Sequence, residues 1–533
     1  MATAETTVPR TEYAEYSSAT RWIIMAAVML GTLMQMIDSS IVNVAIPTMM
    51  GNLGSTLDQI SWVTTGYILS NVIMLPLTGW LSSVFGRRVF LSASMALFTI
   101  ASVLCGMSHT LTMLVVCRII QGIGGAALVS TAQATMMEIF PPQQLGMVQA
   151  IYGLGVMVGP TVGPTLGGWI VDNLSWPWVF YINLPIGIIA TLFTFHFMHD
   201  SRHARTHGRI DFIGIFLLAI GLGSLQMLLE KGSREGWFDS QLIIWLTICA
   251  AIGIISFIIW ELHIKHPVVN LRVLRHRGFA AGTLFGTALG VALYGGIFIL
   301  PVYLQQMQHY TARQTGIIML PGALASAVIM PIIGKLVNKF PPKLLITIGV
   351  LGASISTYML HTISSNTSPG DLFWPLVLRG ASMGFLWVPL SLASLSSLHG
   401  IEMAEGTALF NLSRQLGGSA GIAFLSTFLI DRVTYHHTRL IEHLSVYSPL
   451  VQQRVATLQN GFLAKGFSLV QAHQQALTYL DSIVQGQSAI LAYEDIFVVM
   501  TVIFLSTLSL LFFFEKGNPI TRSTARRRPS KAE

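Results

Sequence analysis

The sequence predicts an all-α protein that crosses a membrane fourteen times, with two six-helix repeats and two extra helices between them. Composition, hydropathy and an internal repeat support this prediction. Of the 533 residues, 53% are apolar and only 10% are Asp, Glu, Lys or Arg, whereas a soluble protein carries roughly 25% charged residues. So few charges cannot cover a globule of 58.2 kDa, and disordered chains are poor in apolar residues. The composition therefore excludes a soluble multidomain enzyme and a disordered chain.

Apolar runs long enough to span a bilayer recur along the whole chain. A spanning helix needs about 20 mostly apolar residues. Runs of this kind cover 22–47, 61–81, 89–108, 111–137, 146–170, 178–198, 211–230, 241–260, 280–304, 313–334, 343–362, 372–398, 404–430 and 491–514. Because their number is even, both ends of the chain are expected on one side of the membrane.

The distribution of Lys and Arg predicts which side that is. If the N-terminus is cytoplasmic, the cytoplasmic segments hold 20 of the 30 basic residues, the opposite side holds 7 and the spans hold 3. Cytoplasmic loops are enriched in Lys and Arg, so we expect both termini in the cytoplasm. The net charge of +7 then reflects topology, and no nucleic-acid partner is expected.

Three sequence matches indicate an internal repeat. The segment from Pro76 recurs from Pro331, the one ending at Arg118 recurs before Arg379, and the one from Ala150 recurs from Ala408, at offsets of 255, 261 and 258 residues. Paired six-helix repeats around a central cavity are typical of alternating-access transporters. The expected organisation is a cytoplasmic tail at 1–21, a first bundle at 22–198, the extra helix pair with cytoplasmic linkers at 199–279, a second bundle at 280–514 and a basic cytoplasmic tail at 515–533.

Two ionisable residues lie deep inside predicted spans. Asp38 is ~14 Å and Arg118 ~10 Å from the outer end of its helix, at 1.5 Å per residue. A charge inside the membrane is costly unless paired or hydrated, so such residues are functional by default. We expect the two to interact across the cavity. In the alternative, Arg118 caps backbone carbonyls and Asp38 is a structural tie between helices.

A glycine- and proline-rich span predicts a tightly packed, bent helix. Small residues at Gly159, Gly163 and Gly167 permit close contact between helices, and prolines such as Pro164 remove a backbone donor and can kink the helix. Such a helix suits a gate, although ordinary membrane packing also uses glycine.

Metal binding is not expected. Cys105, Cys117 and Cys249 lie in apolar runs without metal-site spacing. Four histidines at helical spacing could form a metal site, but a solvated basic linker is the favoured interpretation; they are His196, His199, His203 and His207.

Several motifs together resemble the major facilitator superfamily, and within it the 14-span drug:proton antiporter-2 family. They are Met36–Pro47 in span 1, Gly79–Arg88 between spans 2 and 3, Arg118–Gly124 in span 4, Gly159–Gly168 in span 5 and Trp176–Gly187 at span 6. The resemblance covers about residues 20–515. Two departures are Ser83, where an acidic residue is usual, and Ala150, where the antiporter motif has glycine.

The resemblance implies a function. It implies an antiporter, not an enzyme, that exports amphiphilic drugs or toxic compounds across the bacterial inner membrane and needs no cofactor beyond the proton gradient. It also implies the pump component of a tripartite efflux system, with a periplasmic membrane-fusion adaptor and an outer-membrane channel as partners besides the lipid bilayer. Two alternatives stay open: an exporter or symporter of one endogenous metabolite, and a membrane-embedded lipid-modifying enzyme.

Residue roles follow from the motifs and from position. The expected proton-coupling residues are Asp38, Arg118 and Glu230, although Glu230 is also placed to be merely interfacial. Gating is expected at Gly79, Gly86, Arg87, Arg88, Gly159, Gly163, Pro164, Gly167 and Gly168. Pockets for varied ligands are apolar and aromatic with few polar groups, so the candidate substrate contacts are Gln35, Trp62, Tyr67, Gln121 and Trp387.

The extracytoplasmic loop at 431–490 is too long for a simple connector. Apolar residues from Leu440 to Leu458 recur near helical spacing, broken by Pro449 and Gly461. We therefore expect a pair of amphipathic helices that either docks the adaptor or packs on itself as a cap.

Overall fold

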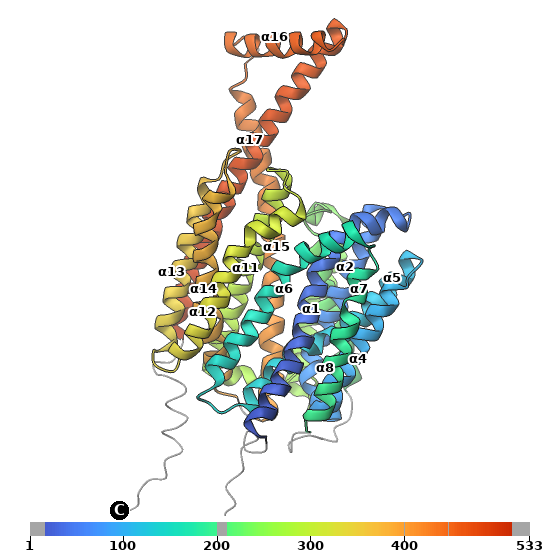
Figure 1. Ribbon diagram of the computed structural model, residues 1–533, viewed down its shortest axis with the longest axis vertical. Helices are drawn as coiled ribbons and strands as arrows, with labels where there is room; N and C mark the ends of the chain where they lie inside the picture. The colour runs from blue at the N-terminus through green and yellow to red at the C-terminus, as the bar shows by residue number, and fades with distance from the viewer. Residues whose placement is uncertain (1–15, 200–210, 399, 446, 514–533) are drawn as a thin grey trace, which may run out of the picture.

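The protein is an all-helical bundle with a long projection at one end (Figure 1). The computed structural model describes residues 16–199, 211–398, 400–445 and 447–513. Fourteen helices in this part of the chain are long and apolar enough to cross a membrane, which confirms the predicted number. Most of segment 199–210 with His203 and His207, residues 1–15 of the predicted N-terminal tail and the whole predicted C-terminal tail lie outside the described residues.

The first six spans contain nine helical segments. Pro76 lies in a short 3₁₀ turn inside span 2, and a short separate helix forms the start of span 6. The segments are α1 (Ser18–Asn52), α2 (Leu57–Met74), η2 (Leu75–Leu77), α3 (Thr78–Phe85), α4 (Arg87–Gly106), α5 (Leu111–Ile139), α6 (Leu145–Asn173), α7 (Trp178–Tyr181) and α8 (Asn183–Phe197).

The remaining helical segments form the extra helix pair, the second half and the projection. Polar caps fix several starts; for example, Thr311 and Gln314 form a capping box at the start of α12. The segments are α9 (Phe212–Lys231), η3 (Trp237–Asp239), α10 (Gln241–His263), η4 (Leu271–Arg275), α11 (Arg277–Gln306), α12 (Ala312–Leu336), α13 (Pro342–Met359), η5 (Leu360–Thr362), α14 (Pro369–Leu395), α15 (Ile401–Glu442), α16 (Pro449–Ala464), α17 (Leu469–Ser506) and η6 (Thr507–Phe513).

The two six-helix halves repeat the same packing. In the first half α1 packs on α6, α5 on α2 and α4, and α4 on α8; in the second, α11 packs on α15, α14 on α12 and α13, and α13 on α17. These pairs correspond when spans 1–6 are matched with spans 9–14. The helical packing therefore confirms the repeat read from the sequence.

The halves meet through α6 against α12 and through α15 against η2 and α3. Because spans alternate in direction, the start of α6 and the end of α12 share the lower end of the bundle in Figure 1, where α1 begins. There a Cβ on Gly146 would lie 2.1 Å from the carbonyl oxygen of Gly334, and a Cβ on Gly79 would lie 2.7 Å from the Cα of Glu405. The backbones of the two halves thus touch at the lower end, and we call these contacts at Gly146 and Gly79 the lower closure.

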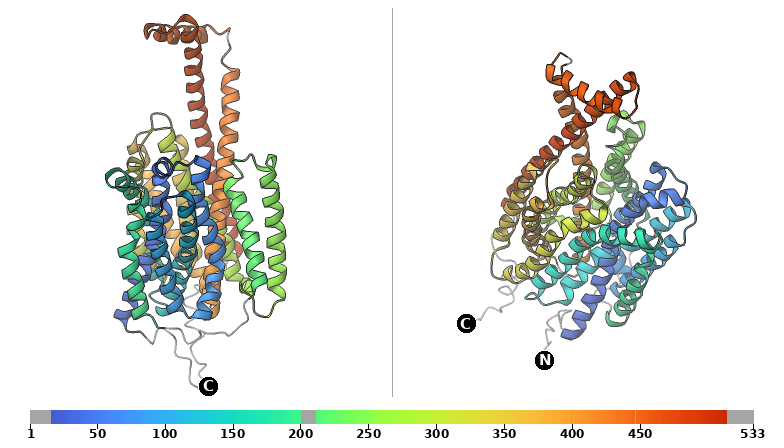
Figure 2. Two further views of the ribbon diagram at one scale, coloured as in Figure 1. Left: turned by 90° about the vertical axis from the view of Figure 1, so that its right-hand side faces the viewer. Right: turned by 45° about the horizontal axis from the view of Figure 1, so that its top comes forward.

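The extra helices α9 and α10 form a hairpin at one edge of the bundle (Figure 2). Glycines allow their backbones to touch, since a Cβ on Gly253 would lie 2.7 Å from the Cα of Gly221. Helix α9 packs on α2 and α15, and the Trp237 indole beyond its end donates to Thr427 of α15 at 2.8 Å. The hairpin therefore contacts both halves, through α2 of the first and α15 of the second.

The projection corrects the prediction for 431–490. Spans 13 and 14 do not end at the membrane boundary: α15 continues to Glu442 and α17 begins at Leu469, so only α16 is a separate helix, and Gly461 does not break it. Hydropathy marks where a helix leaves the membrane and carries no signal for where the helix ends. Arg432 and His436 of α15 both contact Asp495 of α17, at 2.6 and 2.7 Å, and join the two helices at the base of the projection.

The lower closure can be tested with one methyl group. We expect Gly146→Ala to lower the melting temperature of the purified protein, because overpacking typically costs about 1–3 kcal/mol. Gly278→Ala on α11 is the matched control, since a Cβ there meets nothing within 4 Å. Equal melting temperatures for the two variants would contradict the backbone contact.

Candidate functional site

A buried ion pair joins α1 to α5. The Nη1 of Arg118 donates to Oδ2 of Asp38 at 2.6 Å, and the side chains are 1% and 0% exposed. Removing one partner of a buried pair typically costs about 3–5 kcal/mol, because it leaves an uncompensated charge. The pair therefore fixes how these two helices face each other.

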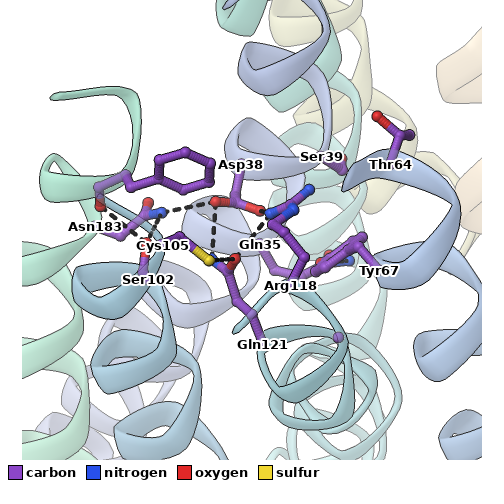
Figure 3. Close-up of polar contacts among 12 residues, drawn as sticks. Gln35, Asp38, Ser39, Thr64, Tyr67, Ser102, Cys105, Arg118, Gln121 and Asn183 are labelled. Carbon is purple, nitrogen blue, oxygen red and sulfur yellow. Dashed lines mark hydrogen bonds and ion pairs between the residues drawn. The ribbon is translucent and has the colours of Figure 1, made fainter. Parts of the chain in front are cut away.

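Neutral amides complete the surroundings of the Asp38 carboxylate (Figure 3). Gln121 of α5 and Asn183 at the start of α8 each donate to Oδ1 at 2.9 Å, and Asn183 also contacts Ser102 of α4 at 3.0 Å. An ionised carboxylate only accepts hydrogen bonds, so three donors from two other helices suit its charged form. We call Asp38, Arg118, Gln121 and Asn183 the Asp38 network.

The guanidinium of Arg118 has further partners. It donates to the Val63 carbonyl at 3.2 Å and to Oε1 of Gln121 at 2.8 Å, and it lies over the Tyr67 ring at 4.3 Å. Gln121 follows Arg118 by three residues and therefore shares its helix face. Asn183 belongs to the Trp176–Gly187 motif, but no role was predicted for it from the sequence.

A cavity lies between the two halves, beside the Asp38 network. Its volume is about 180 Å³. The residues that line it include Gln35, Tyr67, Asn71, Pro160, Tyr294, Trp387, Asn411, Arg414 and Gln415. Tyr67 and Gln35 connect the cavity to the network, since Gln35 donates to the Tyr67 hydroxyl at 3.1 Å. The expected contact between Asp38 and Arg118 is present, but within the first half and not across the cavity.

The second half contributes an arginine to the cavity wall. Arg414 donates to the Tyr294 hydroxyl at 2.9 Å and to Oδ1 of Asn411 at 3.0 Å, and it lies over the Trp387 ring at 4.6 Å. Asn411 in turn donates to Gln133 of the first half at 2.8 Å. Arg414 is one of the three basic residues inside the predicted spans, and no partner was predicted for it.

The candidate substrate residues separate into two groups. Gln35, Tyr67 and Trp387 line the cavity. The other two do not line it. Gln121 is 0% exposed and belongs to the Asp38 network. The ring centre of Trp62 is 5.0 Å from the amino group of Lys231.

The third candidate proton-coupling residue lies apart from the network. Glu230 is on α9 and accepts a hydrogen bond from Thr65 of α2. One of its carboxylate oxygens is buried without a hydrogen-bond partner in the protein. Glu230 is therefore at the contact between the extra hairpin and the first half.

The residues of the Gly79–Arg88 motif lie at the lower end of the bundle, where Gly79 is part of the lower closure. Gly79 touches α15, and Gly86 has a φ of +81° between α3 and α4, a conformation that glycine adopts readily. Arg87 forms an ion pair with Glu138, and Arg88 donates to the Phe195 carbonyl at 2.7 Å. Ser83, where an acid is usual, donates to the Trp80 carbonyl of its own helix.

The glycines of α6 pack against α1. A Cβ would meet Met36 at 2.4 Å from Gly159, Ser40 at 1.8 Å from Gly163 and Ile41 at 2.8 Å from Gly167. Gly168 differs, because a Cβ there meets nothing within 4 Å. Pro164 follows Gly163 directly and lies inside α6. Three of the four glycines thus set the distance between α6 and the helix that carries Asp38.

This arrangement of two six-helix repeats around a central cavity defines a membrane transporter. A family model described as Major Facilitator Superfamily matches residues 28–422, and the chain belongs to that family. The human organic anion transporter MFSD10 has the same fold, with a TM-score of 0.57 at 15% identity over 92% of this chain and 99% of that one.

Curated relatives match at higher identity. The multidrug export protein EmrB of Escherichia coli (strain K12) is 35% identical over 92% of this chain and 94% of its own length. The fatty acid resistance protein FarB of Neisseria gonorrhoeae is 32% identical over 93% of this chain and 96% of its own.

The contact between α6 and α1 gives a prediction for transport. Gly163→Ala should reduce the transport rate, because its Cβ cannot coexist with the Ser40 hydroxyl, whereas Gly168→Ala should leave the rate near wild type. Transport of a fluorescent amphiphile into everted vesicles measures both. Adding Ser40→Gly to Gly163→Ala should restore part of the rate; equal rates for the two single variants would refute the packing role.

Proposed function

We propose that the protein is a proton-driven antiporter that exports amphiphilic drugs or toxic compounds across the bacterial inner membrane. The names of relatives that match along nearly the whole chain support export of this kind. The observation that carries proton coupling is the buried carboxylate of Asp38, held by an arginine and two amides beside the cavity.

Protonation of Asp38 would weaken its contact with Arg118. A protonated carboxyl carries no charge to pair with Arg118, and its new O–H needs an acceptor, which a guanidinium cannot provide. Arg118 would then be a buried charge without its partner, and it stacks on Tyr67 of the cavity wall. A proton on Asp38 therefore favours a rearrangement that reaches the substrate cavity.

The same carboxylate lies on the helix against which α6 packs. A shift of α1 would be transmitted to α6 through Gly159, Gly163 and Gly167, and α6 also forms the lower closure against α12. We propose that proton binding and opening of the lower end are linked through this path. Glu230, half-buried against α2, is a candidate second proton site.

The cavity is the proposed substrate site, with Gln35, Tyr67 and Trp387 as contacts. From the distribution of basic residues, we propose that both ends of the chain and the lower closure face the cytoplasm and that the projection lies outside. The proton gradient is the energy source, with no cofactor.

Asp38→Asn tests the proton. Asparagine keeps the size and one acceptor but cannot carry or release a proton, so we expect substrate-driven proton movement in proteoliposomes to be lost. Equilibrium substrate binding should be retained in part. Asp58→Asn is the matched control, because Asp58 is exposed at the start of α2. Uphill transport at the wild-type rate by Asp38→Asn would refute the proposal.

We further propose that the projection docks a periplasmic adaptor leading to an outer-membrane channel. No residue of α16 is buried, so this helix is not simply a cap packed on the bundle. Its neighbourhood exposes Tyr447, Leu450 and Val470, at 91%, 77% and 69% of their surface. Apolar side chains exposed in this way outside the membrane bundle are available for contact with a partner.

Replacing residues 443–468 with a Gly/Ser linker of about 15 residues, flexible enough to span the gap, tests this docking surface. Transport in vesicles should persist, because the replaced segment lies beyond the membrane bundle (Figure 1). Resistance of whole cells to exported compounds and co-purification of an adaptor should be lost. Full cellular resistance after the replacement would refute the docking role.

A further inference from the structure

We infer that the cavity contains an anion-binding subsite centred on Arg414, so that the preferred substrates carry a carboxylate or a similar anionic head group. This inference rests on the proposed function only in taking the cavity as the substrate site. It concerns the chemistry of the ligand and not the proton.

Arg414 is a buried charge without a counter-ion. Its side chain is 4% exposed, and its contacts are the neutral groups of Tyr294, Asn411 and Trp387. Within the described residues no carboxylate forms an ion pair with it. By contrast, Arg118 has Asp38 and Arg87 has Glu138. Buried charges are normally paired, so the missing anion at Arg414 points to a ligand.

Unused hydrogen-bonding atoms gather at the same place. The Nε of Arg414 and the indole Nε1 of Trp387 are buried, and neither has a hydrogen-bond partner in the protein. The Arg414 guanidinium is 4.6 Å from the Trp387 ring, so the two donors belong to adjacent side chains of one cavity. Buried donors are almost always satisfied, and a carboxylate accepts several hydrogen bonds at once.

The rest of the cavity fits the apolar part of such a ligand. Ile68, Val129, Val156, Met157 and Leu293 line it, and no Asp or Glu side chain does. A cationic head group would therefore meet the positive charge of Arg414 with no acid to offset it. At about 180 Å³ the cavity is smaller than the roughly 300–1,000 Å³ usual for drug-sized ligands, so it fits a head group with a short apolar body.

The experiment compares three ligands that share an eight-carbon chain: octanoate, octanamide and octyltrimethylammonium. Binding to the purified full-length protein is measured by calorimetry at pH 7.5, where octanoate is ionised. We expect octanoate to bind about tenfold or more tightly than the other two, since hydrogen bonds to charged groups are the strong ones. Equal or tighter binding of octanamide or octyltrimethylammonium would overturn the inference.

Substitutions then locate the preference. Arg414→Gln should abolish the difference between octanoate and octanamide, Arg414→Lys should keep part of it, and Arg379→Gln should keep all of it. Arg379 is the control because it lies in a membrane-spanning helix but does not line the cavity. A preference unchanged in correctly folded Arg414→Gln would overturn the inference.

Two further measurements cover the remaining outcomes. If Arg414→Gln does not fold, Trp387→Phe removes the neighbouring indole donor and should weaken octanoate more than octanamide; equal weakening would overturn the subsite. The same comparison in Asp38→Asn should retain the octanoate preference. Failure of proton coupling and failure of the anion subsite are therefore distinguishable.

Discussion

The low dielectric of the membrane interior makes the pairing of Asp38 with Arg118 the constraint on which the first half depends. Neither charge is tolerable alone at 0–1% exposure, so α1 and α5 must present these side chains to each other. The amides of Gln121 and Asn183 then extend the constraint to a third helix, α8. Tyr67 carries it to the cavity wall, because it lies against Arg118 on one side and accepts from Gln35 on the other.

Features that leave a pattern along the chain, such as hydropathy or a repeat, could be predicted from the sequence. Hydropathy located the fourteen spans, and the offsets near 258 residues identified the repeat that the packing confirms. Asp38 and Arg118 could be paired because charges are rare in spans and their depths match. Neutral polar residues such as Asn411 could not, since many of them serve packing alone and its partner Gln133 is 278 positions away. The ends of α15 and α17 were also missed, because a helix in water needs no apolar run.

The two halves share a fold but differ in charge. The first half neutralises its deep arginine internally, whereas the second directs Arg414 at the cavity with neutral partners only. Asn411 accepts from Arg414 and donates to Gln133, which donates to Gln149 at 3.2 Å. This chain of buried hydrogen bonds crosses from one half to the other. A ligand that draws Arg414 towards itself therefore acts on a bond that holds the halves together.

Helix α15 runs without interruption from the lower closure, where it touches α3, to the projection above the bundle (Figure 2). With 42 residues it is about 63 Å long at 1.5 Å per residue, and it is joined to α17 through Asp495. This helix therefore connects the lower closure rigidly to the projection. Any tilt of the second half displaces the far tip by more than it displaces any residue inside the membrane. A protein bound at that tip would therefore be displaced whenever the second half tilts.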